Sequence, residues 1–130
     1  MAGVRNDFRH LLPEVIFDAV EILGGRCTGR LLALNAMENR VYDVEPEGQD
    51  NIVVKFYRPG RWSESTIQAE HDFLSACAAA EVPVVCALAD AGGRTVFEIQ
   101  EIRYAMFPKR PGRLEPELNR EQLKRLGRFL

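Results

Sequence analysis

A chain of 130 residues with 46% hydrophobic and 28% charged side chains has the composition of one compact domain with a modest core. Its net charge of -2 argues against a general nucleic-acid or membrane-surface role, because both depend on clustered positive charge. The three cysteines lack C-x-x-C spacing, and the sequence shows no signal-peptide core or membrane-length apolar run, so we expect a cytoplasmic protein without disulfides or a zinc site.

The first predicted element is an amphipathic helix that begins near Pro13 and ends at Gly24-Gly25. Apolar residues recur between these points at helical spacing, proline is favoured in a first helical turn, and glycine commonly follows the last turn. Three strand-like runs follow, separated by short polar connections: 30–34, 39–44 and 51–57. Connections of this length predict antiparallel pairing.

A second helix is predicted over 64–79 and ends before Pro83. Ser63 or Ser65 can cap its first turn, and Ser65 with Gln68 has the spacing of a capping box. The residues expected on its apolar side share helical spacing: Ile67, Phe73, Leu74, Cys77 and Ala78.

The rest of the chain predicts further strands and a last helix. Three runs are expected to be extended, with a turn at Gly92-Gly93: 84–89, 95–99 and 102–107. Segment 117–130 has an amphipathic helical pattern with no stop signal behind it, so we expect a truncated C-terminal helix. Together the elements predict an α+β fold: an antiparallel sheet of about five strands, one packed helix and an N-terminal helix.

Lys55 is the first candidate functional residue. Alternation along its strand places it on the same face as Val53 and Tyr57. A strand lysine is commonly solvent-facing, with a packed stem and an ammonium group that reaches water. Glu70 on the following helix offers a second interpretation, because a strand lysine paired with a helix glutamate is the kinase arrangement for holding nucleotide phosphates. The alternative for Glu70 is a solvated helix residue.

The turn at 34–42 occupies the position of a kinase phosphate loop but lacks its glycines. With Val41 aligned to the valine of G-x-G-x-x-G-x-V, the three glycine positions hold other residues: Leu34, Ala36 and Asn39. These side chains restrict the approach of the backbone to a phosphate. Asn35 and Asn39 are therefore the candidate side-chain donors.

Several ordered stretches carry a resemblance to a known family: A-L-N-A-M-E-N-R-V-Y at 33–42, V-V-K-F-Y-R-P-G-R-W at 53–62, A-E-H-D-F at 69–73, E-V-P-V at 81–84 and A-M-F-P at 105–108. Over most of its length the chain resembles the bacterial stress response kinase A group, within the aminoglycoside phosphotransferase and choline kinase superfamily. The resemblance implies a protein-kinase-like N-terminal lobe. It also implies phosphorylation of serine and threonine in a protein substrate, with ATP and Mg²⁺ as cofactors.

The resemblance implies a role in ATP binding for each candidate residue. Lys55 looks like the lysine that contacts the α and β phosphates, and Glu70 looks like its helix partner. The turn with Asn35 and Asn39 resembles the segment that covers the phosphates.

The segment from Met106 to Lys109 resembles the hinge that binds adenine between the two lobes of a kinase. Pro108 has no N–H, so the expected pair for adenine is the Phe107 carbonyl and the Lys109 N–H. The implied division is an ATP-binding N-lobe over 1–108, and a hinge with the start of a helical C-lobe over 109–130.

Phosphoryl transfer needs a catalytic aspartate and metal-binding asparagine and aspartate side chains. The His71-Asp72 step lies inside a predicted helix, so we expect those groups, including all magnesium ligands, in a C-lobe that this chain lacks. The chain alone is therefore expected to be inactive and to self-associate through the surface left for that lobe. Two alternatives stay open: the lobe of a small-molecule kinase that acts on aminoglycoside-like or choline-like substrates, and a non-catalytic interaction module.

Overall fold

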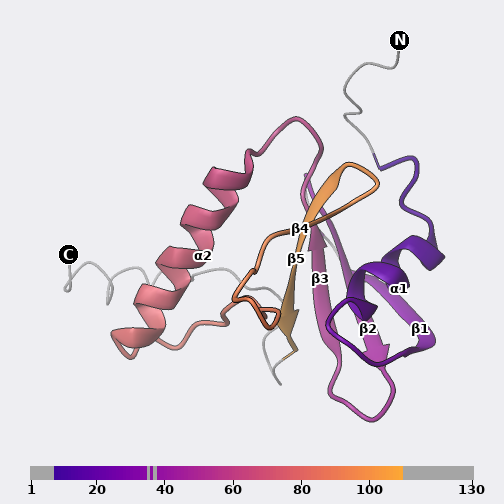
Figure 1. Cartoon of the computed structure of the whole chain (residues 1–130), viewed down its shortest axis with the longest axis horizontal. Coiled ribbons are helices and arrows are strands. Elements are labelled where there is room, and N and C mark those ends of the chain that lie inside the picture. The colour runs from indigo at the N-terminus through magenta and orange to yellow at the C-terminus, as the bar shows by residue number, and fades with distance from the viewer. Residues whose placement is uncertain (1–7, 35, 37, 110–130) are drawn as a thin grey trace.

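The computed structural model describes residues 8–34, 36 and 38–109, and it shows one antiparallel sheet with a helix on each side (Figure 1). Its elements follow in chain order: α1 (Pro13–Glu21), β1 (Cys27–Leu34), β2 (Arg40–Pro46), β3 (Ile52–Phe56), α2 (Glu64–Ala79), β4 (Phe97–Ile99) and β5 (Ile102–Pro108). The five strands lie in the order β1-β2-β3-β5-β4. The predicted α+β fold is confirmed, and the helix predicted over 117–130 lies outside the described residues.

One core fills the space between the sheet and α1. Ile52, Val54 and Phe56 alternate along β3 and all belong to this core, as the period of a strand requires. The buried side of α1 includes Ile16, and the Tyr104 hydroxyl on β5 donates a 2.8 Å hydrogen bond to the Ala19 carbonyl of α1. The N-terminal helix is thus tied to the middle of the sheet by packing and by a buried hydrogen bond.

A second core lies between the sheet and α2. Val53, Ala105 and Phe107 face this side and pack in one cluster with Ile67 and Leu74 of the helix. The chain between α2 and β4 passes between the helix and the sheet (Figure 1) and adds two buried valines to the cluster, Val85 and Val96. The face that carries Lys55 therefore borders an apolar layer, as the alternation along β3 predicts.

The cap of α2 is Ser63, so the capping box predicted at Ser65 and Gln68 is wrong. Ser63 has an extended backbone (φ -80°, ψ 159°), and its side chain accepts a 3.1 Å hydrogen bond from the Thr66 N–H. Ser65 already lies inside the helix. The Gln68 amide donates to Asp72 at 3.1 Å instead of reaching back to the first turn.

The buried stripe of α2 differs in two respects from the predicted one. Phe73 is 37% exposed and Ala78 is also exposed, whereas His71 is only 3% exposed. His71 lies four residues after Ile67 and three before Leu74, which is the spacing of a single helix face. The hydrophobicity of Phe73 suggested burial, but its position on the helix turns it outward.

The run at 84–89, predicted as extended, does not form a strand of the sheet. Leu88 donates a 2.7 Å backbone hydrogen bond to the Met106 carbonyl, but no ladder continues from it. Val85 is buried by packing in the core beside α2. Neither α1 nor α2, the helices of the described ranges, is long and apolar enough to cross a membrane.

Candidate nucleotide-binding site

Lys55 lies at the centre of the sheet, with Val41 of β2 and Ala105 of β5 as its lateral neighbours. It is only 9% exposed, and its Nζ lies 5.1 Å from the centre of the Tyr57 ring. Within the described ranges, no carboxylate forms an ion pair with this ammonium group. A nearly buried charge that only an aromatic face supports is well placed to accept an incoming anion.

Glu70 reaches the same place from α2 but does not contact Lys55 directly. Its Oε1 accepts a 3.1 Å hydrogen bond from the Tyr57 hydroxyl. Burial, and then the Glu70 charge, raise the pKa of Tyr57, so the phenol stays protonated and remains a donor. The two residues predicted as a lysine-glutamate pair are therefore brought together through a third side chain, Tyr57.

His71, next to Glu70 on α2, is buried against the same site. Its Nδ1 shares a 2.7 Å hydrogen bond with the Thr95 hydroxyl, and its ring meets the Phe107 ring edge-on at 6.0 Å. Its buried Nε2 has no hydrogen-bond partner among the residues the structure describes. Burial lowers the pKa of His71; the Glu70 carboxylate opposes this shift and the Lys55 ammonium adds to it.

This shift of the His71 pKa predicts a pH-dependent stability. The folded-state pKa of His71 lies below the ordinary value of 6.5, so folding favours the neutral ring. The contribution of the neutral ring to the free energy of unfolding is therefore fully present above pH 6.5. As the pH falls through the folded-state pKa, the contribution is lost, with a slope of at most about 1.4 kcal/mol per pH unit. Urea unfolding between pH 7.5 and 5.5 should show this decline in the wild type and a flatter profile in His71→Gln. His10→Gln, at an exposed histidine, is the control; equal slopes in wild type and His71→Gln would contradict the assignment.

The turn before β2 is fastened to the loop after β3. The Asn39 side-chain oxygen accepts a 3.0 Å hydrogen bond from the Arg58 N–H, and Glu38 forms a 3.2 Å ion pair with Arg61. The Asn39 amide NH₂ takes no part in that bond. Asn35, the other predicted donor, lies outside the described residues.

The backbone of the predicted hinge is already engaged in the sheet. The Lys109 N–H donates to the Asn51 carbonyl at 3.1 Å, and six positions further along the ladder the Tyr57 N–H donates to the Arg103 carbonyl at 2.9 Å. This register makes Val53 and Phe107 a hydrogen-bonded pair, so the Phe107 carbonyl also faces β3. The two groups expected to bind adenine are thus turned inward.

The register of β5 against β3 allows the strand to include Pro108. Pro108 is paired with Ile52 at a position where backbone groups point away from β3, so its missing N–H removes no hydrogen bond from that ladder. Met106 has the same orientation, and its carbonyl accepts from Leu88 at 2.7 Å. The proline therefore marks the end of the strand without breaking its pairing with β3.

A buried aspartate beside the hinge is missing from the sequence-based prediction. Asp43 on β2 is 5% exposed; its Oδ2 lies 2.5 Å from Lys109 Nζ, and its Oδ1 accepts from the Asn51 amide at 2.8 Å. Alternation from Val41 places Asp43 on an inward face, which is the signal available in the sequence. Its partner Lys109 is 66 residues away, so no local pattern connects them. Both Lys109 and Asn51 hold the end of β5 to the sheet.

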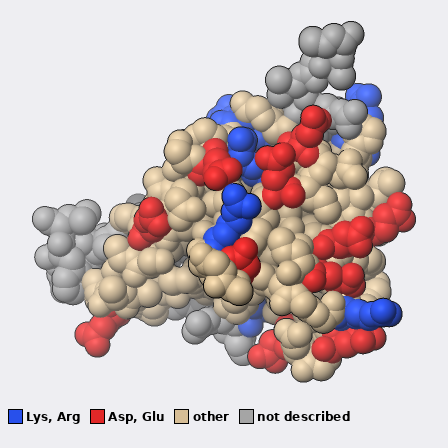
Figure 2. Space-filling view, viewed as in Figure 1, with Lys and Arg blue, Asp and Glu red and all other residues tan. Residues whose placement is uncertain are grey.

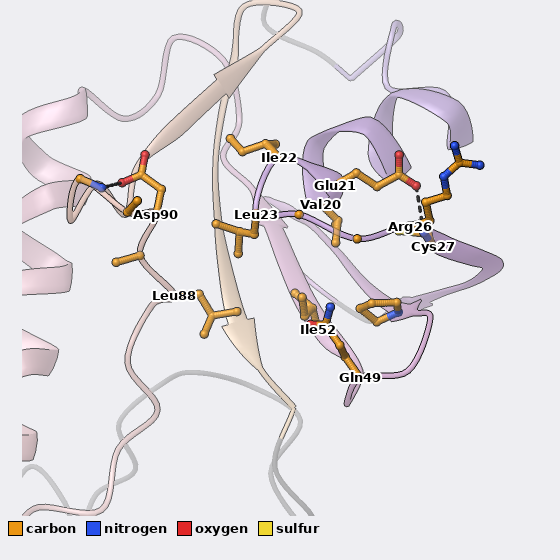
Figure 3. Close-up of a pocket in the computed structure, with 16 residues that line it drawn as sticks. Val20, Glu21, Ile22, Leu23, Arg26, Cys27, Gln49, Ile52, Leu88 and Asp90 are labelled. Atoms are coloured by element: carbon orange, nitrogen blue, oxygen red, sulfur yellow. Dashed lines mark hydrogen bonds between the residues drawn. The ribbon is translucent and has the colours of Figure 1, made fainter.

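A separate cavity of about 550 Å³ opens beside the end of α1, the turn at Gln49 and the chain at Leu88 (Figure 3). Two carboxylates that line it accept hydrogen bonds from backbone N–H groups, Glu21 at 2.9 Å and Asp90 at 2.9 Å. None of the described residues predicted to bind ATP lines this cavity. The cavity is therefore distinct from the site around Lys55.

Charge is mixed on the face of the molecule that Figure 2 shows. Acidic and basic side chains are interspersed there and form no continuous basic patch among the coloured residues. Interspersed charges of opposite sign give this face no strong field that would attract a phosphate from a distance.

The chain is similar in sequence to a known enzyme family and to several bacterial kinases. Residues 31–130 match the model of the phosphotransferase enzyme family. Over 123 residues the chain is 42% identical to stress response kinase A of Salmonella typhi and to serine/threonine protein kinase RdoA of Salmonella typhimurium, and 39% identical to stress response kinase A of Escherichia coli K12. These alignments cover 95% of this chain, which spans 37% of the length of each of these relatives.

A solved structure shows the same fold. The amicoumacin kinase hAmiN, determined in complex with AMP-PNP, Ca²⁺ and Ami, matches with a TM-score of 0.66 and 21% identity. The match covers 77% of this chain and 31% of that one, in agreement with a kinase-like N-terminal lobe. Because residues 31–130 match the family model, this chain belongs to the phosphotransferase enzyme family.

Proposed function

We propose that this chain is the nucleotide-binding lobe of an ATP-dependent serine/threonine protein kinase that acts in the stress response. The observation that carries the proposal is the Lys55 ammonium group, nearly buried on the α2 side of the sheet without a carboxylate partner among the described residues. A buried charge is costly unless an anion compensates it. In a phosphotransferase the natural anion is the nucleotide phosphate, and the names of the relatives favour a protein acceptor in the stress response.

The residues around Lys55 fit a nucleotide. Val53, Ala105 and Phe107 are buried on the same side of the sheet and form the apolar layer that Lys55 borders. Lys55 is assigned to the α and β phosphates, with Glu70 behind it, and the Asn39 amide together with Asn35 to the covering turn. Bound ATP would supply the γ-phosphoryl group.

Adenine is assigned to the end of β5. Because the Phe107 carbonyl and the Lys109 N–H are held by β3, we expect adenine to bond the Pro108 carbonyl, which points away from that strand. Met106, Phe107 and Lys109 then position the hinge through their sheet contacts. This keeps the proposed division of the chain, with the N-lobe ending at residue 108.

We assign no Mg²⁺ ligand to the described residues. The described residues contain no group of three or more His, Cys, Asp or Glu side chains that could hold a metal ion. We propose that the Mg²⁺ ligands lie elsewhere in the full-length protein, together with the catalytic aspartate, so that this chain alone is inactive. We also propose that the protein is cytoplasmic and that the isolated chain self-associates.

The acceptor decides between the candidate functions. We would incubate the full-length gene product with labelled ATP and Mg²⁺, offering a mixture of proteins in one reaction and aminoglycosides or choline in another. The expected result is label on serine and threonine, identified by phosphoamino-acid analysis. Label on the small-molecule hydroxyls alone would replace this proposal with a small-molecule kinase. No ATP binding and no transfer would indicate a non-catalytic interaction module.

A further inference from the structure

Tyr57 stands between the two residues on which the proposed site depends. It follows Lys55 by two positions, so both side chains lie on the same side of the sheet. Tyr57 is only 3% exposed. Its hydroxyl donates a 3.1 Å hydrogen bond to Glu70, and its ring lies 5.1 Å below the Lys55 ammonium group. One buried side chain thus contacts both.

Lysine and glutamate need such support for a physical reason. Both side chains are long, and holding either in one rotamer costs conformational entropy. Glu70 is exposed on α2, and a direct ion pair at an exposed position is weak. Tyr57 is a rigid side chain with two torsions and a buried ring, so it can restrain its neighbours at little entropic cost.

The contacts also leave both charged groups able to act. Tyr57 occupies Glu70 Oε1, and a carboxylate has a second oxygen with which it can accept from an ammonium group. The face of the Tyr57 ring attracts the ammonium group of Lys55 without removing any of its three N–H donors from a phosphate. Burial and the Glu70 charge raise the pKa of Tyr57, which keeps the phenol a donor.

We propose that Tyr57 is a positioning residue of the nucleotide site: its hydroxyl fixes Glu70 while its ring supports Lys55. The inference rests on the proposed ATP-binding function. In this arrangement the link between the strand lysine and the helix glutamate passes through the aromatic side chain. The position of α2 relative to the sheet is thereby coupled to the position of the phosphate-binding charge.

The test compares variants of the full-length protein by titration with ATP and Mg²⁺. Tyr57→Phe keeps the ring and removes the hydroxyl, and it should weaken ATP binding about tenfold, the size expected for one hydrogen bond to a charged group. Tyr57→Leu removes both contacts and should weaken binding further. Tyr104→Phe removes a hydroxyl that donates to the Ala19 carbonyl on the α1 side of the sheet and should leave the affinity unchanged. Melting temperatures show whether each variant folds.

A double-mutant cycle separates positioning from a merely structural role. In a Glu70→Ala background, Tyr57→Phe should have no further effect on ATP affinity, because the partner of the hydroxyl is gone. Additive losses would overturn the inference, as would an unchanged affinity in Tyr57→Phe. Tighter ATP binding by Tyr57→Phe would also overturn it, since Tyr57 would then compete with Lys55 for Glu70.

Lys55→Met distinguishes failure of the inference from failure of the proposed function. If this variant and the wild type bind ATP equally, the proposed function fails and the role of Tyr57 falls with it. If Lys55→Met loses binding while Tyr57→Phe retains it, ATP binding stands and only the positioning role is rejected.

Discussion

Lys55→Met in the full-length protein should lower phosphoryl transfer from ATP by roughly 100-fold or more, the loss typical of removing one preorganised charge-stabilising group. Methionine keeps an unbranched stem of similar length between Val41 and Ala105 while deleting the charge. The folded state should be as stable as the wild type or more so, because the variant removes a nearly buried ammonium group that has no carboxylate partner among the described residues.

Initial rates of transfer and melting temperatures check the Lys55 prediction together. Arg26→Gln is the matched control, since it removes an exposed positive charge beside the separate cavity of Figure 3. Lys55→Arg should restore little activity, because a planar guanidinium is larger and differs in shape from an ammonium group. A fall in melting temperature that parallels the loss of activity would instead assign Lys55 a structural role.

Phe56→Ala should destabilise the lobe by about 3–5 kcal/mol, the usual range for truncating a fully buried phenylalanine. Phe56 is 0% exposed in the core beside α1. Its ring packs edge-on to Tyr42 at 6.1 Å and lies 5.3 Å from the ring of Tyr104. The variant loses these ring contacts and leaves a cavity between the sheet and α1.

Urea unfolding of the variant and the wild type measures the Phe56 effect. Phe73→Ala provides the comparison, because Phe73 is 37% exposed on α2 and its truncation should cost less than about 1 kcal/mol. Equal losses at the two positions would show that the core beside α1 does not carry the stability assigned to it.

The sheet could be predicted because its signals are local. Alternation along β3 separates Phe56 from Lys55 and Tyr57 by period alone, and the two helices follow from apolar spacing and stop signals. The run at 84–89 has the composition of a strand, yet composition does not reveal whether a partner edge is available. Val85 is buried by α2 and the sheet together, which is a tertiary contact.

The connections within the candidate site depend on tertiary structure. Lys55 and Glu70 each contact Tyr57, and the hydrogen bond of the Tyr57 hydroxyl depends on how α2 lies over the sheet. The pairing of Asp43 with Lys109 crosses 66 residues, and the inward direction of the Lys109 N–H depends on the register between β3 and β5. Register and helix placement are global properties, so short patterns could not supply them.

The fastening of Lys109 has a mechanical consequence. Its backbone is bonded to Asn51 at the start of β3, while its ammonium group is held by Asp43 on β2. A pull or a twist applied to the chain at Lys109 therefore loads two strands at once, and one of them is the strand that continues from the turn at Asn39. Because β2 joins Asp43 to the turn at Asn39, a displacement of Lys109 is transmitted along this strand to the turn that we propose covers the phosphates.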